Sequence, residues 1–283
     1  MTSPSHPRLL LFAGPNGSGK STLTTPQTFS HFGIAPDQYI NADDIASRLA
    51  DEMPDVPQVE RERIAFRRAR ALRATLRQEG ASFAFETVFS HPSTLLDMQE
   101  CRTAGFEITV LFVTTANAEI NVRRVRARVQ AQTGHAVPED RIRSRYERTM
   151  ALLPRIVEEA NCAFVYDNTA QTPIVFSFEN GVPLPPIFPV PAFPHDRLFT
   201  PLQTRGDERN ALAARFPRLD FPSEDAGTYS GLIDTVSAHY MVQQTPSGTF
   251  VRHDLLLFAD GTNHITGQNA VVRYHEGQGT MET

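Results

Sequence analysis

Short apolar runs alternate with longer amphipathic stretches from residue 8 to about residue 167. In the longer stretches, apolar side chains recur at helical spacing, as at Val122, Val125 and Val129. This alternation predicts an α/β domain, a parallel sheet with helices on both faces. Pro154 lies in the last helical stretch and is expected to bend or split that helix. The strands are expected at residues 8–13, 38–41, 82–86, 106–114 and 162–166.

The composition and the hydrophobic pattern of the sequence change after residue 172. Proline is frequent from Pro173 to Pro201 without a durable period, which predicts a semi-rigid linker, and residues 202–227 show no assignable element. Alternation with period two returns at residue 228 and predicts a small, barrel-like all-β domain. The expected organisation is an α/β domain over 1–172, a proline-rich linker over 173–227 and a β domain over 228–283.

The composition excludes several classes of protein. With 40% hydrophobic and 21% charged residues in 283, the chain is neither disordered nor a disulfide scaffold. Its formal net charge of −5 argues against coating nucleic acid or an anionic membrane. No apolar run approaches the roughly 20 residues of a membrane helix, and the N-terminus lacks the features of a signal peptide. Because Cys101 and Cys162 are too few for a stapled secreted fold, we expect a cytoplasmic protein.

The best-defined motif is a glycine-rich loop that follows the first expected strand and opens an expected helix. It fits G-x-x-x-x-G-K-[ST], in which glycines let successive N–H groups face one anion. Lys20, the only lysine of the chain, is expected to reach the β- and γ-phosphates, and Ser21 to hold Mg²⁺; a planar guanidinium is not interchangeable with the ammonium there. The residues expected to bind the nucleotide are Gly14, Pro15, Asn16, Gly17, Ser18, Gly19, Lys20, Ser21, Thr22 and Arg124.

Acidic residues follow the next two expected strands. Asn41, Asp43 and Asp44 end one strand, and Glu86 ends the other. Ligands of open α/β folds bind at this edge of the sheet, where an Asp can take the proton of an attacking hydroxyl or help to place Mg²⁺. The alternative is structural: Asp43 or Asp44 caps a helix that begins at Ile45, and Glu86 is an ordinary solvated carboxylate.

Arginines are concentrated between residues 123 and 148. Arg124 and Arg128 lie four residues apart, as do Arg141 and Arg145, so each pair shares one helical face. A glycine-containing turn at 133–138 joins the two helices, and the pair of faces can close over a triphosphate as a lid. The alternative is a solvated surface on which the arginines pair with Glu139, Asp140 and Glu147.

Other nucleotide-binding classes fit the sequence less well. The chain has no N-K-x-D element for guanine, which disfavours a GTPase, and it lacks the signature and long insertions of a transporter ATPase. Together, its motifs resemble the zeta-toxin family of P-loop kinases, in the compact zeta-like branch. The resemblance covers about residues 8–168 and is carried by the loop 14–21, Ile-Asn-Ala-Asp at 40–43, Phe-Glu-Thr-Val-Phe-Ser-His at 85–91, and residues 128–146.

The resemblance implies ATP-dependent phosphorylation of a sugar hydroxyl, with UDP-N-acetylglucosamine as the acceptor of well-known members, and a toxin that an antitoxin protein restrains. It assigns phosphate binding to Lys20, the base to Asp43 and a substrate-side acid to Glu86. Arg124 or Arg128 fills the first arginine role in the lid, and Arg143 or Arg145 the second. The catalytic set is then Lys20, Asp43, Arg128 and Arg145, and the substrate-binding set is Asn41, Asp44, Glu86, Thr87 and Ser90.

Two departures from the family pattern concern the acceptor. The chain has Val88-Phe89-Ser90 where well-known members have a glycine-rich turn with a substrate-contacting arginine. Ungapped counting places Arg70 where they carry a substrate-binding glutamate. The acceptor is therefore less defined by the sequence than the reaction is.

The C-terminal segment resembles the KfrB-type domain of plasmid-encoded proteins, which implies a mobile-element setting. His253 and Asp254 lie in it and are expected to be structural. Two alternatives to a free kinase stay open. The chain is a nucleotide-dependent interaction module whose β domain contacts protein or nucleic acid, or the tail or linker restrains the kinase as an internal antitoxin would.

Overall fold

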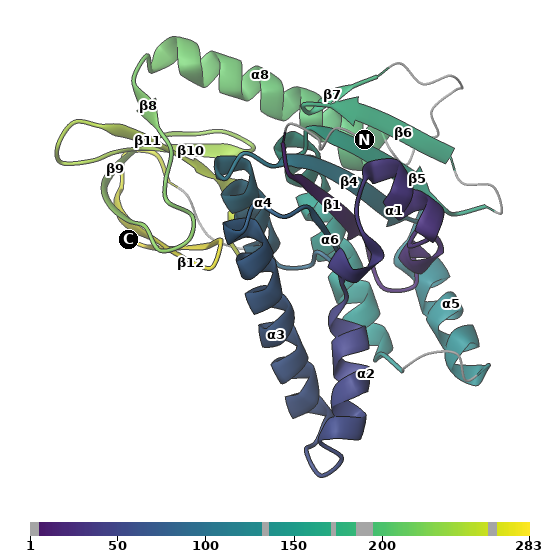
Figure 1. The fold of residues 1–283 in the computed structure, drawn as a ribbon. Coiled ribbons are helices and arrows are strands. Elements are labelled where there is room, and N and C mark those ends of the chain that lie inside the picture. The colour runs from purple at the N-terminus through teal and green to yellow at the C-terminus, as the bar shows by residue number, and fades with distance from the viewer. Residues whose placement is uncertain (1–5, 132–135, 171–173, 185–194, 260–264) are drawn as a thin grey trace. The chain divides into compact units, whose positions relative to one another are not determined.

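The computed structural model describes residues 6–131, 136–170, 174–184, 195–259 and 265–283. They divide into two compact units, each described by itself (Figure 1). The first unit takes in residues 1–90, 98–149 and 156–188, and the second takes in 91–97, 150–155 and 189–283.

The first unit is built on a sheet whose described strands have the order β2-β3-β1-β4-β5-β6-β7. The strands β1 to β5 pair in parallel, as expected, whereas β6 and β7 continue the sheet in antiparallel pairing. The predicted α/β class is therefore confirmed. The strands are β1 Arg8–Ala13, β2 Tyr39–Ile40, β3 Phe83–Thr87, β4 Glu107–Thr114, β5 Cys162–Asp167, β6 Ile174–Glu179 and β7 Val182–Pro183.

Both faces of the central strands are buried, which explains why β1 is an unbroken apolar run. On one face, Leu10 and Phe12 pack with Phe29 of the first helix in a cluster that Tyr39 and Tyr166 border. Side chains that point to the opposite face, such as those of β1 residues 9 and 11, are also fully buried. The apolar runs therefore place the strand ends, and the residues that follow them, along one edge.

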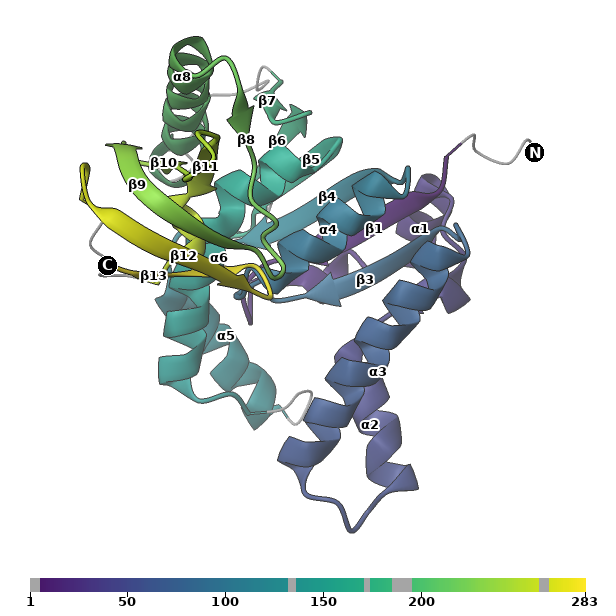
Figure 2. The same ribbon diagram turned by 90° about the vertical axis from the view of Figure 1, so that its left-hand side faces the viewer.

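Helices connect the parallel strands. In both ribbon views, α2 and α3 run side by side as a hairpin that extends beyond the sheet (Figures 1 and 2). The last long helix, α6, is continuous through Pro154, so the expected split was wrong. The helices are α1 Pro26–Phe32, α2 Ala42–Glu52, α3 Gln58–Gln78, α4 Ser93–Thr103, α5 Ala118–Gln130 and α6 Glu139–Glu159.

The glycine-rich loop leads into a short 3₁₀ turn rather than directly into a helix. This turn, Lys20–Thr22, is followed by α1, which begins only at Pro26 behind the capping residue Thr25. Proline has no N–H to continue a helix begun at Lys20, but it suits the first turn of a new one. The expectation that the loop opens directly into a helix is therefore wrong, and the amides of the loop itself are the donors that face an anion there.

The second unit holds a sheet whose described strands have the order β13-β12-β9-β10-β11-β8. Most neighbours are antiparallel, and only β11 and β8 pair in parallel. The predicted C-terminal β domain is confirmed. The elements are α8 Thr200–Arg215, β8 Leu219–Asp220, β9 Thr228–Val236, β10 Tyr240–Gln244, β11 Phe250–Asp254, β12 Asn269–His275 and β13 Gln278–Glu282.

The segment expected as a linker contains regular structure. Residues 174–183 form β6 and β7 of the first sheet, and residues 200–215 form α8, with Leu212 packed on Tyr240 and Val242. Proline frequency marked this segment as extended, but the prolines lie largely between these elements. Composition averaged over the segment therefore hid a strand pair and a helix.

The described helices include none that is both long and apolar enough to cross a membrane.

Candidate active site

The glycine-rich loop has a shape that only glycine permits. Gly14, Gly17 and Gly19 have φ values of 138°, 79° and 102°, a region that side chains disfavour. A Cβ on Gly14 would lie 2.0 Å from the carbonyl oxygen of Val113, and one on Gly19 would lie 2.5 Å from the amide nitrogen of Asn168. The loop therefore fits the backbone cradle that phosphate groups require.

Lys20 lies inside this loop with 7% of its surface exposed. Its Nζ donates to the carbonyl oxygen of Pro15 at 3.2 Å and lies 3.8 Å from Oε1 of Glu86. Burial lowers the pKa of Lys20; Arg128 adds to this effect, whereas the carboxylates of Glu86 and Asp43 oppose it. Glu86 of β3, Asp43 of α2 and Arg128 of α5, three charged groups from different elements, thus act on the ionisation of this ammonium.

The pKa of Lys20 provides a direct test of phosphate binding at this residue. The pKa of Lys20 is lowered in the protein without nucleotide, and the negative charge of a bound phosphate should raise it. The affinity for nucleotide should therefore fall as pH rises through the pKa that Lys20 has without nucleotide. NMR of ¹³Cε-labelled lysine reports this side chain alone, since the chain has no other lysine. We expect a midpoint below the ordinary lysine value without ATP and a higher one with ATP. A midpoint that ATP leaves unchanged would contradict phosphate binding at Lys20.

The acidic residues after β2 are not helix caps. Asn41 caps α2, with its Oδ1 accepting from the N–H of Asp43 at 2.9 Å, and the helix begins at Ala42 rather than Ile45. The alternative that Asp43 or Asp44 caps the helix is therefore wrong. Both carboxylates lie in the first turn, and Asp43 is close enough to Lys20 and Arg145 to oppose the lowering of both pKa values.

Glu86 is not an ordinary solvated carboxylate, since only 15% of its side chain is exposed. One oxygen faces Lys20, and the other, Oε2, accepts from the hydroxyl of Tyr39 at 3.1 Å. Tyr39 was not among the residues expected at the site. Its place in β2, two residues before Asn41, was the available signal, but an aromatic residue in a strand is most often part of the core.

The arginines of α5 and α6 divide between the loop and the outer surface. Arg145 donates to Oδ1 of Asn16 at 3.4 Å, and Arg124 donates to the carbonyl oxygen of Asn168 at 2.7 Å. Arg143 instead pairs with Glu119 at 2.6 Å, so of the two candidates for the second role only Arg145 reaches the loop. The alternative of a paired surface therefore describes part of the cluster.

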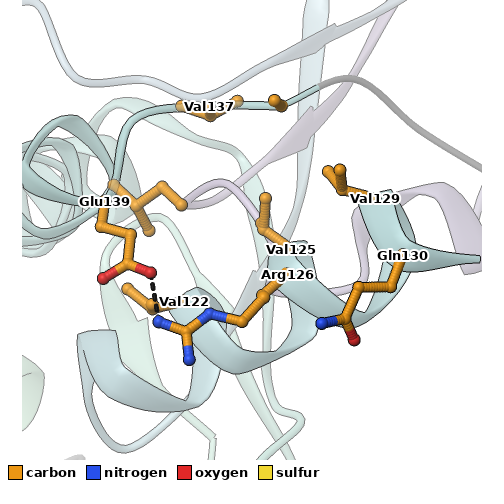
Figure 3. A pocket seen from close by; sticks show the side chains of 9 residues that line it. Val122, Val125, Arg126, Val129, Gln130, Val137 and Glu139 are labelled. Carbon is orange, nitrogen blue, oxygen red and sulfur yellow. Dashed lines mark hydrogen bonds and ion pairs between the residues drawn. The ribbon is translucent and has the colours of Figure 1, made fainter.

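A small, largely apolar hollow is lined by residues of α5, of α6 and of the segment that precedes α6 (Figure 3). Arg126 pairs with Glu139 at its rim. Val125 and Val137 line it. Residues 133–135 of the expected lid turn lie outside the described residues, so closure of a lid stays an expectation.

Three further expected residues have distinct surroundings. Both the N–H and the hydroxyl of Thr22 donate to the carbonyl oxygen of Gly19, so Thr22 is engaged within the turn. The hydroxyl of Thr87 accepts from the N–H of Phe89 and shapes the segment toward Ser90. The side chain of Ser21 is exposed, and its oxygen suits Mg²⁺, which prefers hydroxyl, carboxylate and phosphate oxygens.

Comparison with known proteins agrees with this geometry. Residues 9–152, just over half of the chain, match the family described as an AAA domain. The chain belongs to the AAA domain family. Residues 228–283, beyond this AAA domain, match the KfrB domain. The predicted nucleotide-binding domain followed by a KfrB-type domain is thus confirmed.

Relatives of the AAA domain protein were found by sequence and by structure. An uncharacterized protein of Haemophilus influenzae is 28% identical over 139 residues, 49% of this chain and 92% of that protein. The AvrRxo1-ORF1:-ORF2 complex with ATP is similar in fold, with a TM-score of 0.52, 14% identity and 63% of this chain covered. The match spans 60% of that solved chain. The PezAT toxin-antitoxin system of Streptococcus pneumoniae matches with a TM-score of 0.43, 18% identity, and 59% and 69% coverage.

Proposed function

We propose that this protein is an ATP-dependent phosphotransferase whose acceptor is a hydroxyl of a nucleotide sugar such as UDP-N-acetylglucosamine. The observation that carries the proposal is the buried Lys20 in a glycine cradle, 3.8 Å from Glu86 and near Asp43. Carboxylates this close repel a bare triphosphate, so their place is explained by a role toward Mg²⁺ or toward a second substrate. They suit a second substrate that must lose a proton.

The proposed chemistry uses residues of the glycine-rich loop with its 3₁₀ turn, of α2, of α5 and of α6. Asp43 takes the proton of the acceptor hydroxyl while that oxygen attacks the γ-phosphorus. The bond from γ-phosphorus to the bridging oxygen breaks, and ADP leaves with the electron pair. Lys20, Arg128 and Arg145 stabilise negative charge on the transferring group. When bound, Mg²⁺ neutralises charge on the β- and γ-phosphates, and Ser21 is the residue proposed to hold it.

Positive charge beside Asp43 supports an acceptor that is itself anionic. Burial lowers the pKa of Arg145, and Arg141 and Arg148 contribute to the lowering. These arginines are spaced at i, i+4 and i+7 on α6 and therefore share one face. A diphosphate group on the acceptor would neutralise this face, which a neutral sugar would not.

The acceptor is identified by mass spectrometry of UDP-sugars, other nucleotides and free sugars incubated with the protein, ATP and Mg²⁺. We expect one phosphoryl group to be added to a nucleotide sugar. Asp43→Asn should lower kcat about 100-fold while leaving ATP affinity unchanged, because it removes the base and not the cradle. Asp51→Asn is the matched control, with the same charge change on the same helix. Equal rates for the wild type and Asp43→Asn would exclude Asp43 as the base.

We propose that this activity makes the protein the toxin of a toxin-antitoxin pair in the bacterial cytoplasm. Support comes from the motifs shared with the zeta-toxin family and from the fold shared with the AvrRxo1-ORF1:-ORF2 complex, which contains two components. An antitoxin protein is then the expected partner, and neither membrane nor nucleic acid is required. Expression of the wild type should slow bacterial growth, and expression of Asp43→Asn should not.

A further inference from the structure

A linear series of hydrogen bonds joins the start of α2 to Glu86. The N–H of Asp43 donates to Oδ1 of Asn41 at 2.9 Å, and Nδ2 of Asn41 donates to the hydroxyl oxygen of Tyr39 at 3.2 Å. That hydroxyl donates to Oε2 of Glu86 at 3.1 Å. The backbone of Asp43 is therefore linked to the carboxylate of Glu86 through the amide of Asn41 and the phenol of Tyr39.

The donor and the acceptor of each hydrogen bond in this series are fixed by the neighbouring bond. Oδ1 of Asn41 accepts from a backbone N–H, so the end of the amide that faces Tyr39 can only donate. Tyr39 must then give its one proton to Glu86, which as a carboxylate can only accept. Burial, together with the nearby charge of Glu86, raises the pKa of Tyr39, so the phenol keeps this proton over the neutral range.

The ring of Tyr39 holds its hydroxyl in place. Tyr39 is in β2, in parallel register with Ala84 of β3, and its ring centroid lies 5.2 Å from that of Phe29 and 6.0 Å from that of Phe12. Such packing leaves few ring rotamers. Movement of the hydroxyl would therefore require the aromatic cluster to repack.

We propose that Tyr39 is a positioning residue for phosphoryl transfer, which keeps Glu86 at a set place relative to Asp43 at the start of α2. This inference rests on the proposed function, which assigns both carboxylates to the acceptor. Tyr39 touches neither the nucleotide nor the reacting atoms in this role. Its effect reaches the acceptor through Glu86 and Asn41.

The variant Tyr39→Phe keeps the ring and removes only the hydroxyl. We expect kcat/KM for the acceptor to fall about tenfold, as for the loss of one or two hydrogen bonds to a charged group. The KM for ATP should stay within about twofold of the wild type, and the melting temperature should be close to that of the wild type. In a Glu86→Ala background, Tyr39→Phe should change kcat/KM less than about twofold, because its partner is absent.

Tyr166→Phe is the matched control, since Tyr166 borders the same apolar cluster from β5 and is not a member of the hydrogen-bond series from Asp43 to Glu86. It should keep kcat/KM within about twofold of the wild type. Wild-type kcat/KM in Tyr39→Phe, or an equal loss with and without Glu86, would overturn the proposal for Tyr39 alone. If the wild type phosphorylates no acceptor, the proposed function is wrong and the role of Tyr39 falls with it.

Discussion

Replacement of Lys20 with methionine is expected to abolish phosphoryl transfer, with kcat/KM reduced by about 10³-fold or more. Lys20 is the buried cation of the loop, and its Nζ donates to the carbonyl oxygen of Pro15. Methionine has a similar length and no charge, so the cradle keeps its shape but loses the charge that faces the phosphates. Transfer is measured with the acceptor found by mass spectrometry, and ATP affinity by calorimetry.

The stability of this variant separates a role in binding from a role in folding. Burial already disfavours the ammonium of Lys20, so an apolar side chain there should not lower the melting temperature appreciably. Lys20→Arg provides the matched control for charge, because it keeps the cation but replaces a compact ammonium with a planar fork. We expect it to be nearly as inactive as the methionine variant. Full activity of either variant would remove Lys20 from the mechanism.

The parts of the site that depend on local sequence could be predicted. The loop at 14–21 needs glycine at positions of positive φ, and these glycines are part of a motif that can be recognised in eight consecutive residues. Strand ends could be located as well, because an apolar run stops where the chain leaves a doubly buried sheet. Asp43 and Glu86 followed from that rule; Glu86 lies 3.8 Å from Lys20, and the charge of Asp43 acts on the pKa of Lys20.

The relations between distant segments could not be predicted. The bond from Tyr39 to Glu86 joins residues 47 positions apart, and no periodicity encodes such a pair. The same holds for the choice between Arg143 and Arg145, which depends on the position of Glu119 in the preceding helix. Similarly, α8 was hidden because its apolar residues pack on strands that follow it in the chain.

The second unit contains a buried ion-pair network that the sequence indicated only as an adjacent histidine and aspartate. His253 is fully buried and makes hydrogen bonds to Tyr274 at 2.8 Å and to Gln243 at 3.2 Å. Asp254 accepts from Arg205 at 2.6 Å and from Arg155 at 2.7 Å. Both residues are thus part of the interior, as the structural interpretation expected.

Replacement of Asp254 with asparagine is expected to destabilise the second unit by about 3–5 kcal/mol, the usual cost of removing one partner of a buried ion pair. Asp254 is 3% exposed and Arg205 1% exposed, so the arginine would keep a buried charge without its carboxylate. Because the two units need not unfold together, hydrogen exchange of the β10 and β11 amides is a better measure than one melting curve.

The pH dependence of this loss has a defined sign. Burial raises the pKa of Asp254, but Arg205 and Arg155 outweigh it and hold that pKa well below its ordinary value. The contribution of Asp254 to the stability of the folded state is therefore full above its pKa in the unfolded state, and it is lost as pH falls toward its lower pKa in the folded state. The difference in stability between the wild type and Asp254→Asn should therefore become smaller below about pH 4. Asp234→Asn breaks a more exposed pair with Arg215 and should cost under about 1 kcal/mol. Equal protection in the Asp254 and Asp234 variants would mean that the buried network does not stabilise this unit.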